Sequence, residues 1–482
     1  MKKLLSITNL KKYFPLAKKS LFQKEQFYVR ANEDISIDIY EGETFGLVGE
    51  SGCGKSTLGR VILQLYEQTA GTTMYYGRSL AEVAPKYVFD TLKRADKYIA
   101  AWKKAEKKAS DAAAKCEALG EGASFHDLQT RNLCEAEAKS ALWRVAKILG
   151  GFTVEGTAEG AAALLEVYRQ TVAEAKGKGN PEAKRTAEDK LGGLRVKYSG
   201  KGEFDKYEEM LDDGIDLSRL TVKEMRDIRR DLQIIFQDPY SSLNPRMTVG
   251  QIIEEGLVTH KFFKPHDKKA KDYIVNQMEE CGLQDYMYAR YPHQFSGGQR
   301  QRICIARSLA VKPKFVVCDE CVSALDVSIQ SQIINLLQEL KEKEKLTYLF
   351  ISHNLSVVRY ISDRIGVMYL GNMVEVADTD TIFRDPRHPY TVALLSSIPT
   401  TDFEESNRER IILGGNIPSP IKPPSGCKFH TRCYMACDKC KRVPPPFVEV
   451  EPGHFVACHN LDRKVDENGK YLFEINRDTS EL

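Results

Sequence analysis

A glycine-rich loop near the N-terminus constrains the fold of this 482-residue chain more than any other feature. The segment GESGCGKS at residues 49–56 fits the pattern G-x-x-x-x-G-K-S. An apolar strand is predicted before it at 44–48 and a helix after it at 57–65, which is the context that a phosphate-binding loop requires. A glycine turn without a ligand is the alternative, and this context disfavours it. The pattern therefore predicts an α/β nucleotide-binding fold.

The residues of this loop have separate expected roles. Glycines let backbone N–H groups turn onto phosphate oxygens, and the start of the following helix adds partial positive charge. Lys55 is expected on the β- and γ-phosphates, and Ser56 on Mg²⁺. The other residues expected to line the nucleotide are Gly49, Glu50, Ser51, Gly52, Cys53, Gly54 and Thr57. ATP and Mg²⁺ are therefore the predicted ligands.

A second apolar strand, predicted at 315–319, ends in two carboxylates. Doubly wound sheets place their ligands at the C-terminal ends of parallel strands. Asp319 suits the Mg²⁺ shell, and Glu320 can polarise an attacking water. An apolar strand that ends in Asp-Glu is a weak signal alone, but together with the phosphate loop it predicts an ATPase.

The composition excludes several other classes of protein. A net charge of +3 on a chain of this size argues against nucleic-acid binding by bulk electrostatics. No stretch reaches the ~18 consecutive apolar residues of a membrane span, and the apolar run at the start is too short for a signal peptide. The chain is therefore expected to stay in the cytoplasm, where its twelve cysteines are thiols or metal ligands rather than disulfides.

Composition also divides the chain into four expected regions. Residues 1–77 and 214–395 alternate apolar runs with turns and are predicted to form one ATPase domain in two parts. Residues 396–482 form a Pro-rich tail that carries five of the cysteines. Residues 78–213 are rich in Ala, Lys and Glu and are predicted to be an inserted all-α domain.

The helical prediction for this insert depends on periodicity. Apolar residues recur three or four apart from Leu92 to Cys116, and glycines mark breaks at 120–122, 150–151 and 177–181. Similar Gly-containing turns near Gly77 and Gly214 predict that its two ends lie close together. It can be a self-packed bundle or a docking surface for a partner or regulator, and its balanced charges disfavour nucleic acid.

The segment SGGQ at 296–299 precedes a predicted helix and resembles the signature of ABC ATPases. Ser296 is expected to cap the helix, and the glycines allow close approach of backbone to phosphate. The resemblance implies that Ser296, Gly298 and Gln299 act on the ATP of a partner subunit, so two sites form only when two such domains face each other.

Other positions of that family follow in order. Gln237 matches the residue that senses Mg²⁺ and the membrane partner, and SALD at 323–326 matches a loop that communicates across the dimer. His353, after a strand predicted at 347–352, matches the residue that contacts the γ-phosphate. The family stacks an aromatic ring on adenine, and here either Tyr13 or Phe14 can serve.

Longer segments of the sequence resemble one subfamily of the ABC ATPases in particular. GLVGESGCGKSTLGR, IIFQDPYSSLNPRMTVGQII, QFSGGQRQRICIARSL, SALDVSIQSQIINLL and HPYTVALLSSIP are similar to the ATPases of oligopeptide, dipeptide and nickel importers, and so is the tail. The resemblance covers 1–77 and about 214–460. Two departures are the helical block and Cys321, where the family has proline.

This resemblance implies a function and partners. ATP hydrolysis would drive uptake of oligopeptides or dipeptides, with nickel possible as the solute. The implied partners are an identical or homologous ATPase subunit, two membrane permeases and an extracytoplasmic solute-binding protein, with no nucleic acid. The chain would lie peripherally on the cytoplasmic face of the membrane.

Two rival functions fit the sequence less well. ABC proteins that act as nucleic-acid clamps in translation carry two tandem ATPase cassettes, and those of DNA repair carry a long coiled coil. This chain has one phosphate loop and a short helical insert. A binder that does not hydrolyse ATP is disfavoured by the intact Asp-Glu pair and by His353.

Four tail cysteines stand in the pattern C-x5-C-x6-C-x17-C, namely Cys427, Cys433, Cys440 and Cys458. In a reducing compartment such a group suggests Zn²⁺ or an iron–sulfur cluster, with ordinary reduced thiols as the alternative. The family resemblance favours a [4Fe–4S] cluster, with Cys437 as the spare thiol.

Overall fold

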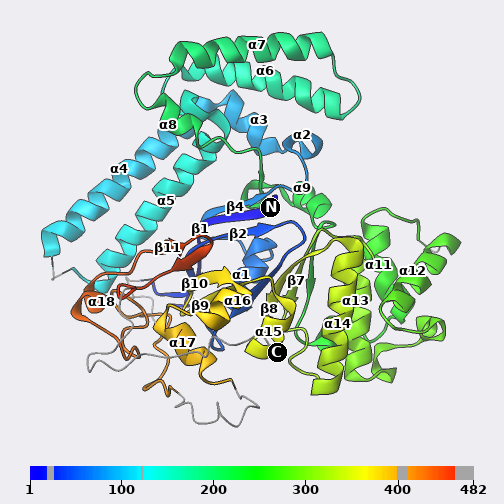
Figure 1. The fold of residues 1–482 in the computed structure, drawn as a ribbon. Coiled ribbons are helices and arrows are strands. Elements are labelled where there is room, and N and C mark those ends of the chain that lie inside the picture. Colours follow the sequence, from blue (N-terminus) through cyan, green and yellow to red (C-terminus); the bar gives the residue numbers. More distant parts are fainter. Residues whose placement is uncertain (19–25, 121–122, 266, 399–410, 462–482) are drawn as a thin grey trace.

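The computed structural model describes residues 1–18, 26–120, 123–265, 267–398 and 411–461 (Figure 1). Its centre is an eight-stranded sheet in the order β11-β12-β10-β9-β3-β8-β7-β6. The strands are β3 (Thr44–Val48), β6 (Leu232–Ile235), β7 (Phe315–Asp319), β8 (Thr347–Ile351), β9 (Arg364–Tyr369), β10 (Asn372–Asp378), β11 (Val448–Glu451) and β12 (His454–Val456).

Strand direction in this sheet decides where the functional residues meet. The neighbours β3, β8, β7 and β6 run parallel, and β9 runs parallel to β3. β3, β7 and β8 are buried along their whole length, as expected of strands covered on both faces. Their C-terminal ends therefore share one edge, and the loops that follow them meet there. On the other side of the sheet, β10 and the tail strands β11 and β12 pair antiparallel.

A second, antiparallel sheet has the order β2-β1-β4-β5. Its strands are β1 (Lys3–Pro15), β2 (Tyr28–Tyr40), β4 (Ala70–Tyr75) and β5 (Ile215–Asp216). It shares a hydrophobic cluster with β3 and with α1 (Lys55–Ile62), so it packs beside the phosphate loop.

Helices pack around the main sheet (Figure 1). They are α9 (Val222–Ile228), α10 (Pro239–Ser242), α11 (Val249–Thr259), α12 (Lys268–Glu280), α13 (Gly297–Leu309), α14 (Val327–Glu344), α15 (Leu355–Ile361), α16 (Thr379–Arg384), α17 (Pro389–Leu395) and, in the tail, α18 (Asp438–Arg442). Short 3₁₀ turns join them at η3 (Leu217–Arg219), η4 (Asp285–Ala289) and η5 (Pro292–Gln294).

Between β4 and β5 the chain forms a separate group of helices, drawn at the top and left of Figure 1. The group consists of α2 (Leu80–Val83), α3 (Lys86–Lys93), α4 (Ala95–Leu119), α5 (Phe125–Leu149), η2 (Gly150–Thr153), α6 (Thr157–Ala175), α7 (Pro181–Tyr198) and α8 (Phe204–Glu208). These helices enclose their own hydrophobic cluster around Trp102, Phe152 and Phe204. α5 also reaches the antiparallel sheet, where Ser140 accepts a hydrogen bond from the Gly71 N–H at 2.9 Å.

The chain leaves for these helices and returns on neighbouring strands. β4 pairs with β5 through Met74 opposite Asp216 and Tyr75 opposite Ile215. This confirms the prediction that the two ends lie close together.

Most predicted elements are present, with shifted ends. β3 and β7 match their predicted bounds, and β8 stops one residue early at Ile351. α1 spans Lys55–Ile62 rather than 57–65, because Gly54 in the left-handed region starts the helix earlier. The apolar stripe from Leu92 is broken at Arg94, whose backbone (φ −130°) separates α3 from α4.

The glycine breaks at 150–151 and 177–181 separate helices as predicted, whereas residues 121–122 lie outside the described ranges. Residues 399–410 and 462–482 of the predicted tail also lie outside them. Across the described parts of the chain, no helix has both the length and the apolar character needed to cross a membrane.

Candidate nucleotide-binding site

The phosphate loop joins β3 to α1, and its backbone requires glycine. Gly49 and Gly54 have φ of +147° and +104°, and a Cβ on Gly54 would lie 2.1 Å from the Ala31 carbonyl oxygen. Lys55 is buried, and its Nζ donates to the carbonyls of Gly49 at 2.8 Å and of Glu50 at 3.1 Å. The ammonium group therefore lies inside the curve of the loop, while Ser51 and Gly52 are exposed at its outer side and Ser56 and Thr57 are half-buried.

Asp319 ends β7 and is 1% exposed. Its Oδ2 accepts a hydrogen bond from Arg60 of α1 at 3.2 Å, whereas its Oδ1 is buried without a hydrogen-bond partner among the described residues. A buried carboxylate oxygen that lacks a partner is costly unless a cation or donor completes it. β7 lies next to β8, which precedes His353, and β8 separates it from β3, which precedes the phosphate loop. The unpartnered oxygen of Asp319 fits a Mg²⁺ ligand.

Glu320 brings together three of the predicted site residues. Its Oε2 accepts a hydrogen bond from Gln237 Nε2 at 2.9 Å and lies 3.7 Å from His353 Nδ1. Its backbone is in the left-handed region (φ +49°), and its N–H donates to the Ile351 carbonyl at 3.0 Å. Strained backbone of this kind is common at functional sites. The ends of β6, β7 and β8 therefore deliver an amide, a carboxylate and an imidazole to one point.

The signature segment forms a capped helix start, as predicted. Ser296 Oγ accepts from the Gln299 N–H at 3.4 Å, and Gln299 Oε1 accepts from the Ser296 N–H at 3.1 Å. Ser296 and Gly297 are exposed, so this end of α13 faces solvent. A Cβ on Gly298 would lie 2.6 Å from the Ile329 side chain, which explains the glycine there.

The loop at 323–326 supports the same edge of the sheet. Ser323 Oγ donates to the Glu320 carbonyl at 2.9 Å, and Asp326 caps α14 by accepting the Ile329 N–H at 3.0 Å. Cys321, the residue that departs from the family pattern, is buried.

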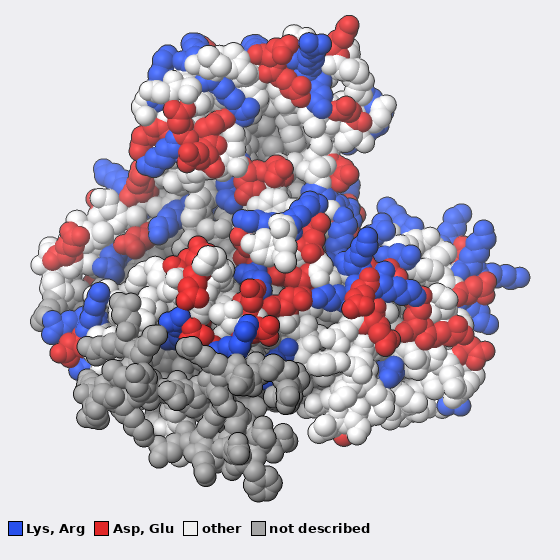
Figure 2. All heavy atoms as spheres, viewed as in Figure 1, with Lys and Arg blue, Asp and Glu red and all other residues white. Residues whose placement is uncertain are grey.

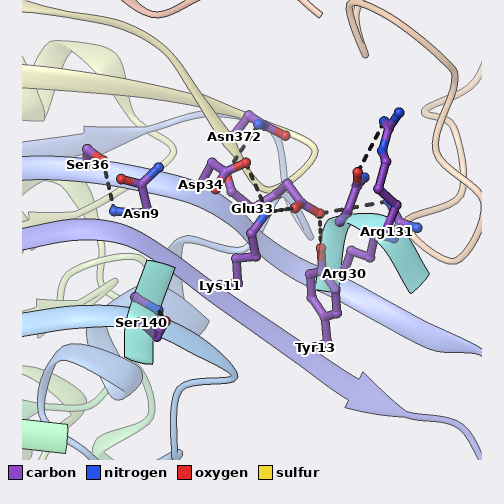
Figure 3. A network of polar contacts seen from close by, with 12 residues as sticks. Asn9, Lys11, Tyr13, Arg30, Glu33, Asp34, Ser36, Arg131, Ser140 and Asn372 are labelled. Carbon is purple, nitrogen blue, oxygen red and sulfur yellow. Dashed lines mark hydrogen bonds and ion pairs between the residues drawn. The ribbon is translucent and has the colours of Figure 1, made fainter. Parts of the chain in front are cut away.

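The two aromatic candidates for adenine differ in their surroundings. Tyr13 is 4% exposed, and its hydroxyl donates to Glu33, which also binds Lys11 (Figure 3). Burial and the Glu33 carboxylate raise the pKa of Tyr13. Phe14 is half-buried, contacts Tyr66 edge to face at 5.5 Å and has no polar group to satisfy. The Lys12 ammonium lies over the Phe14 ring, 4.6 Å from its centroid, so each ring has a partner, and Phe14 is the less buried of the two.

Sequence reasoning missed three residues that contact this site. Arg60 binds Asp319, the Tyr390 hydroxyl accepts the Glu50 N–H at 2.8 Å, and Arg432 of the tail binds the Glu50 carboxylate. Tyr390 and Arg432 are 340 and 382 residues from Glu50 along the chain, so no local pattern could reveal them.

The tail cysteines lie in one neighbourhood. The Cys427 N–H donates to the Cys440 carbonyl at 2.8 Å, and the sulfurs of Cys437 and Cys440 are 3.4 Å apart. Burial raises the pKa of Cys433 to about 12 and that of Cys458 to about 11, and nearby cysteines add to both shifts. In the described ranges, however, no three His, Cys, Asp or Glu side chains are placed so as to hold a metal ion.

A parallel sheet whose strand ends carry a phosphate loop, an Asp-Glu pair and a histidine defines a P-loop ATPase. The sequence model of the ABC transporter family matches residues 32–149 and 201–323. The model described as "Oligopeptide/dipeptide transporter, C-terminal region" matches residues 374–440.

Curated relatives agree with these matches. The putative oligopeptide transport ATP-binding protein YkfD of Bacillus subtilis is 38% identical over 95% of this chain and 95% of its own length. AppF of the same organism, an oligopeptide transport ATP-binding protein, is 35% identical over 95% of this chain and 97% of its own. OppF of Haemophilus influenzae is 48% identical over 51% of this chain and 74% of its own. The chain belongs to the ABC transporter family, among the oligopeptide transport ATP-binding proteins.

Proposed function

We propose that this chain hydrolyses ATP to drive uptake of oligopeptides or dipeptides through a membrane complex. The main support for this proposal is that Gln237, Glu320 and His353 lie together. They meet at the edge of the sheet where β3 leads into the phosphate loop. The solute class, oligopeptides or dipeptides, is inferred from the names of the relatives. The hydrolysis of ATP is inferred from the residues of the site.

Each residue has a role in this proposal. Lys55 and the N–H groups of residues 49–57 bind the phosphates, and Phe14 stacks on adenine. Ser56, Gln237 and Asp319 would hold Mg²⁺, which neutralises charge on the phosphates when bound. The Oδ1 of Asp319 is buried and has no hydrogen-bond partner among the described residues.

Glu320 orients the attacking water, because its carboxylate is held by the Gln237 amide. His353 is 59% exposed, so its ring is free to contact the γ-phosphate.

A partner ATPase subunit completes the site in this proposal. The exposed cap of α13, with Ser296, Gly298 and Gln299, would face the γ-phosphate of a second, identical or homologous subunit. Two permeases and an extracytoplasmic solute-binding protein complete the complex, and the chain lies on the cytoplasmic face of the membrane. On the face drawn in Figure 2, Lys and Arg are interspersed with Asp and Glu, which gives nucleic acid no basic surface there.

Glu320→Gln tests the hydrolytic role, because glutamine keeps the shape but cannot accept the water proton. We expect MgATP binding to persist and turnover to fall by roughly 10²- to 10⁴-fold, the range for loss of a general base. Glu342→Gln, an exposed change on α14, is the matched control. Normal turnover of Glu320→Gln in the purified complex would contradict the proposal.

We further propose that residues 78–213 are an inserted all-α domain. Two observations support it: the ends pair as neighbouring strands, and the helices share their own hydrophobic cluster. The ABC transporter match is interrupted only between 149 and 201, so it supports an insertion at residues 150–200 but continues through 78–149. An apolar hollow of about 480 Å³ lies between α2, α3, α5 and α6, lined by Val88, Leu164 and Tyr168 among others.

For the tail we propose a [4Fe–4S] cluster on Cys427, Cys433, Cys440 and Cys458, with zinc as the alternative. Backbone N–H groups already donate to sulfur, from Met435 to Cys433 at 3.4 Å and from Asn460 to Cys458 at 3.3 Å. Such donors stabilise thiolate ligands, which is the form that binds metal.

Anaerobic purification tests the metal. A cluster predicts brown protein with about four irons per chain, and loss of colour on replacing any of the four cysteines by serine, but not Cys437. About one zinc per chain without iron would replace the cluster by a Cys₄ zinc site. If the purified protein contains neither iron nor zinc, the tail cysteines are ordinary thiols.

A further inference from the structure

The tail is tied to the phosphate loop by an ion pair. Both terminal nitrogens of Arg432 donate to the Glu50 carboxylate, at 2.8 and 3.1 Å. The side chain of Arg432 is 7% exposed and that of Glu50 is 24% exposed, so water screens this pair only partly. Two parallel hydrogen bonds between guanidinium and carboxylate fix orientation as well as distance.

The surroundings hold Arg432 in place. Phe429, three residues earlier, is 1% exposed and packs against Tyr369 at 5.1 Å and Tyr390 at 5.3 Å. The Arg432 N–H donates to the Phe429 carbonyl at 3.0 Å. Tyr390 in turn accepts the backbone N–H of Glu50. One aromatic cluster therefore positions both the arginine and the residue that it binds.

A second connection runs through the turn between β9 and β10. Lys428 of the tail lies 3.5 Å from the Leu370 carbonyl, to which it donates. The next residue, Gly371, donates its N–H to the Cys53 carbonyl of the phosphate loop at 2.9 Å. The tail thus contacts the loop at Glu50 and contacts the turn that holds Cys53.

Electrostatics gives this ion pair a consequence for ATP. Glu50 carries a negative charge on the loop that must accept a polyphosphate, and an unpaired carboxylate there would repel the ligand. Arg432 neutralises that charge beside the N–H groups that bind phosphate oxygens. Removing one partner of a partly buried pair leaves the other charge uncompensated.

We propose that Arg432 is a positioning residue of the ATP site that the Cys-bearing tail supplies, so that MgATP affinity depends on whether the tail is folded around its cysteines. This inference rests on the proposed ATPase function. It adds that the state of the tail thiols, whether metal-bound, reduced or modified, is transmitted to the phosphate loop through Arg432.

A double-mutant cycle on the full chain tests the pair. We expect Arg432→Ala to weaken MgATP binding by about tenfold or more, which corresponds to about 1.4 kcal/mol. Glu50→Gln removes the charge that needs compensation, so Arg432→Ala should cost far less affinity in the Glu50→Gln background. Arg442→Ala, an exposed arginine of the same tail, is the control and should bind normally.

A second measurement tests the link to the cysteines. Cys433→Ser should weaken MgATP binding in the wild-type background, and should have little further effect in Arg432→Ala. If Arg432→Ala does not fold by circular dichroism, Arg432→Lys serves instead, because it keeps the charge but cannot form both hydrogen bonds, and intermediate affinity is expected.

Three results would overturn the inference: normal affinity of folded Arg432→Ala, additive effects of Arg432→Ala and Glu50→Gln, or an undiminished effect of Cys433→Ser in Arg432→Ala. Failure of the wild-type chain to bind MgATP would instead refute the proposed function.

Discussion

Replacing Phe152 by alanine would test whether helices α2–α8 form a unit of their own. Phe152 lies in η2, is fully buried, and contacts Phe204 at 5.2 Å and Tyr198 at 6.1 Å, both edge to face. A Cβ on Gly160 would lie 2.1 Å from the Phe152 ring. The glycine therefore makes room for the ring and has no side chain that could fill the space left by its removal.

This geometry sets the size of the effect. Phe→Ala changes in cores destabilise by about 3–5 kcal/mol, and a site that cannot collapse lies toward the upper end. The two ring contacts contribute about 0.5–1.5 kcal/mol each to that total. We therefore expect a loss of about 4–5 kcal/mol, confined to the helices, because Phe152 belongs to a hydrophobic cluster separate from those of the two sheets.

Hydrogen exchange read by mass spectrometry, together with MgATP affinity, separates local from global effects. Phe152→Ala should lose amide protection across α4–α8 while MgATP affinity is unchanged. The matched control is Phe350→Ala, a fully buried ring of β8, which should lower MgATP affinity. Equal loss of affinity in the two variants would refute the separation of the helices from the ATPase core.

Three further predictions follow from other features. Excising 78–213 and joining the chain at Gly77 and Gly214 should leave a soluble, MgATP-binding protein, because the ends lie on paired strands; insoluble protein would show that the helices belong to the ATPase core. Asp319→Asn should abolish the Mg²⁺ dependence of ATP binding, measured by titration, whereas retained dependence would remove Asp319 from the metal shell. Burial lowers the pKa of His388 from 6.5 to about 4. As the pH falls, His388 is therefore protonated in the unfolded chain before it is protonated in the folded one. The free energy of unfolding should fall by up to about 3 kcal/mol between pH 6.5 and 4. His388→Asn should flatten that part of a urea-unfolding series, and an unchanged slope would contradict the assignment.

Local sequence predicted the parts of the site that depend on local physics. The bounds of β3 and β7 were correct because both are short apolar runs, buried on both faces and followed by polar loops. The Ser296 cap was correct because a capping box needs only residues three positions apart.

The rest depends on contacts that are distant in sequence. The choice between Tyr13 and Phe14 needed Glu33, twenty residues away on another strand, to show that the tyrosine is already engaged. The ion pair of Glu50 with Arg432 joins residues that are 382 positions apart in the chain, so it leaves no periodic signal in the sequence. The break at Arg94 interrupts an apolar stripe that continues through it, so periodicity alone could not place it.

The pairing of β12 with β10 has a practical consequence for work on the isolated ATPase. A chain shortened after residue 395 would open the edge of β10, where Glu375 and Val376 now pair with Val456 and Phe455. It would also remove His454, whose ring lies 2.8 Å from the fully buried Glu375 carboxylate. Open strand edges recruit other strands. Such a shortened protein is expected to self-associate, and that aggregation alone would be no measure of its affinity for MgATP.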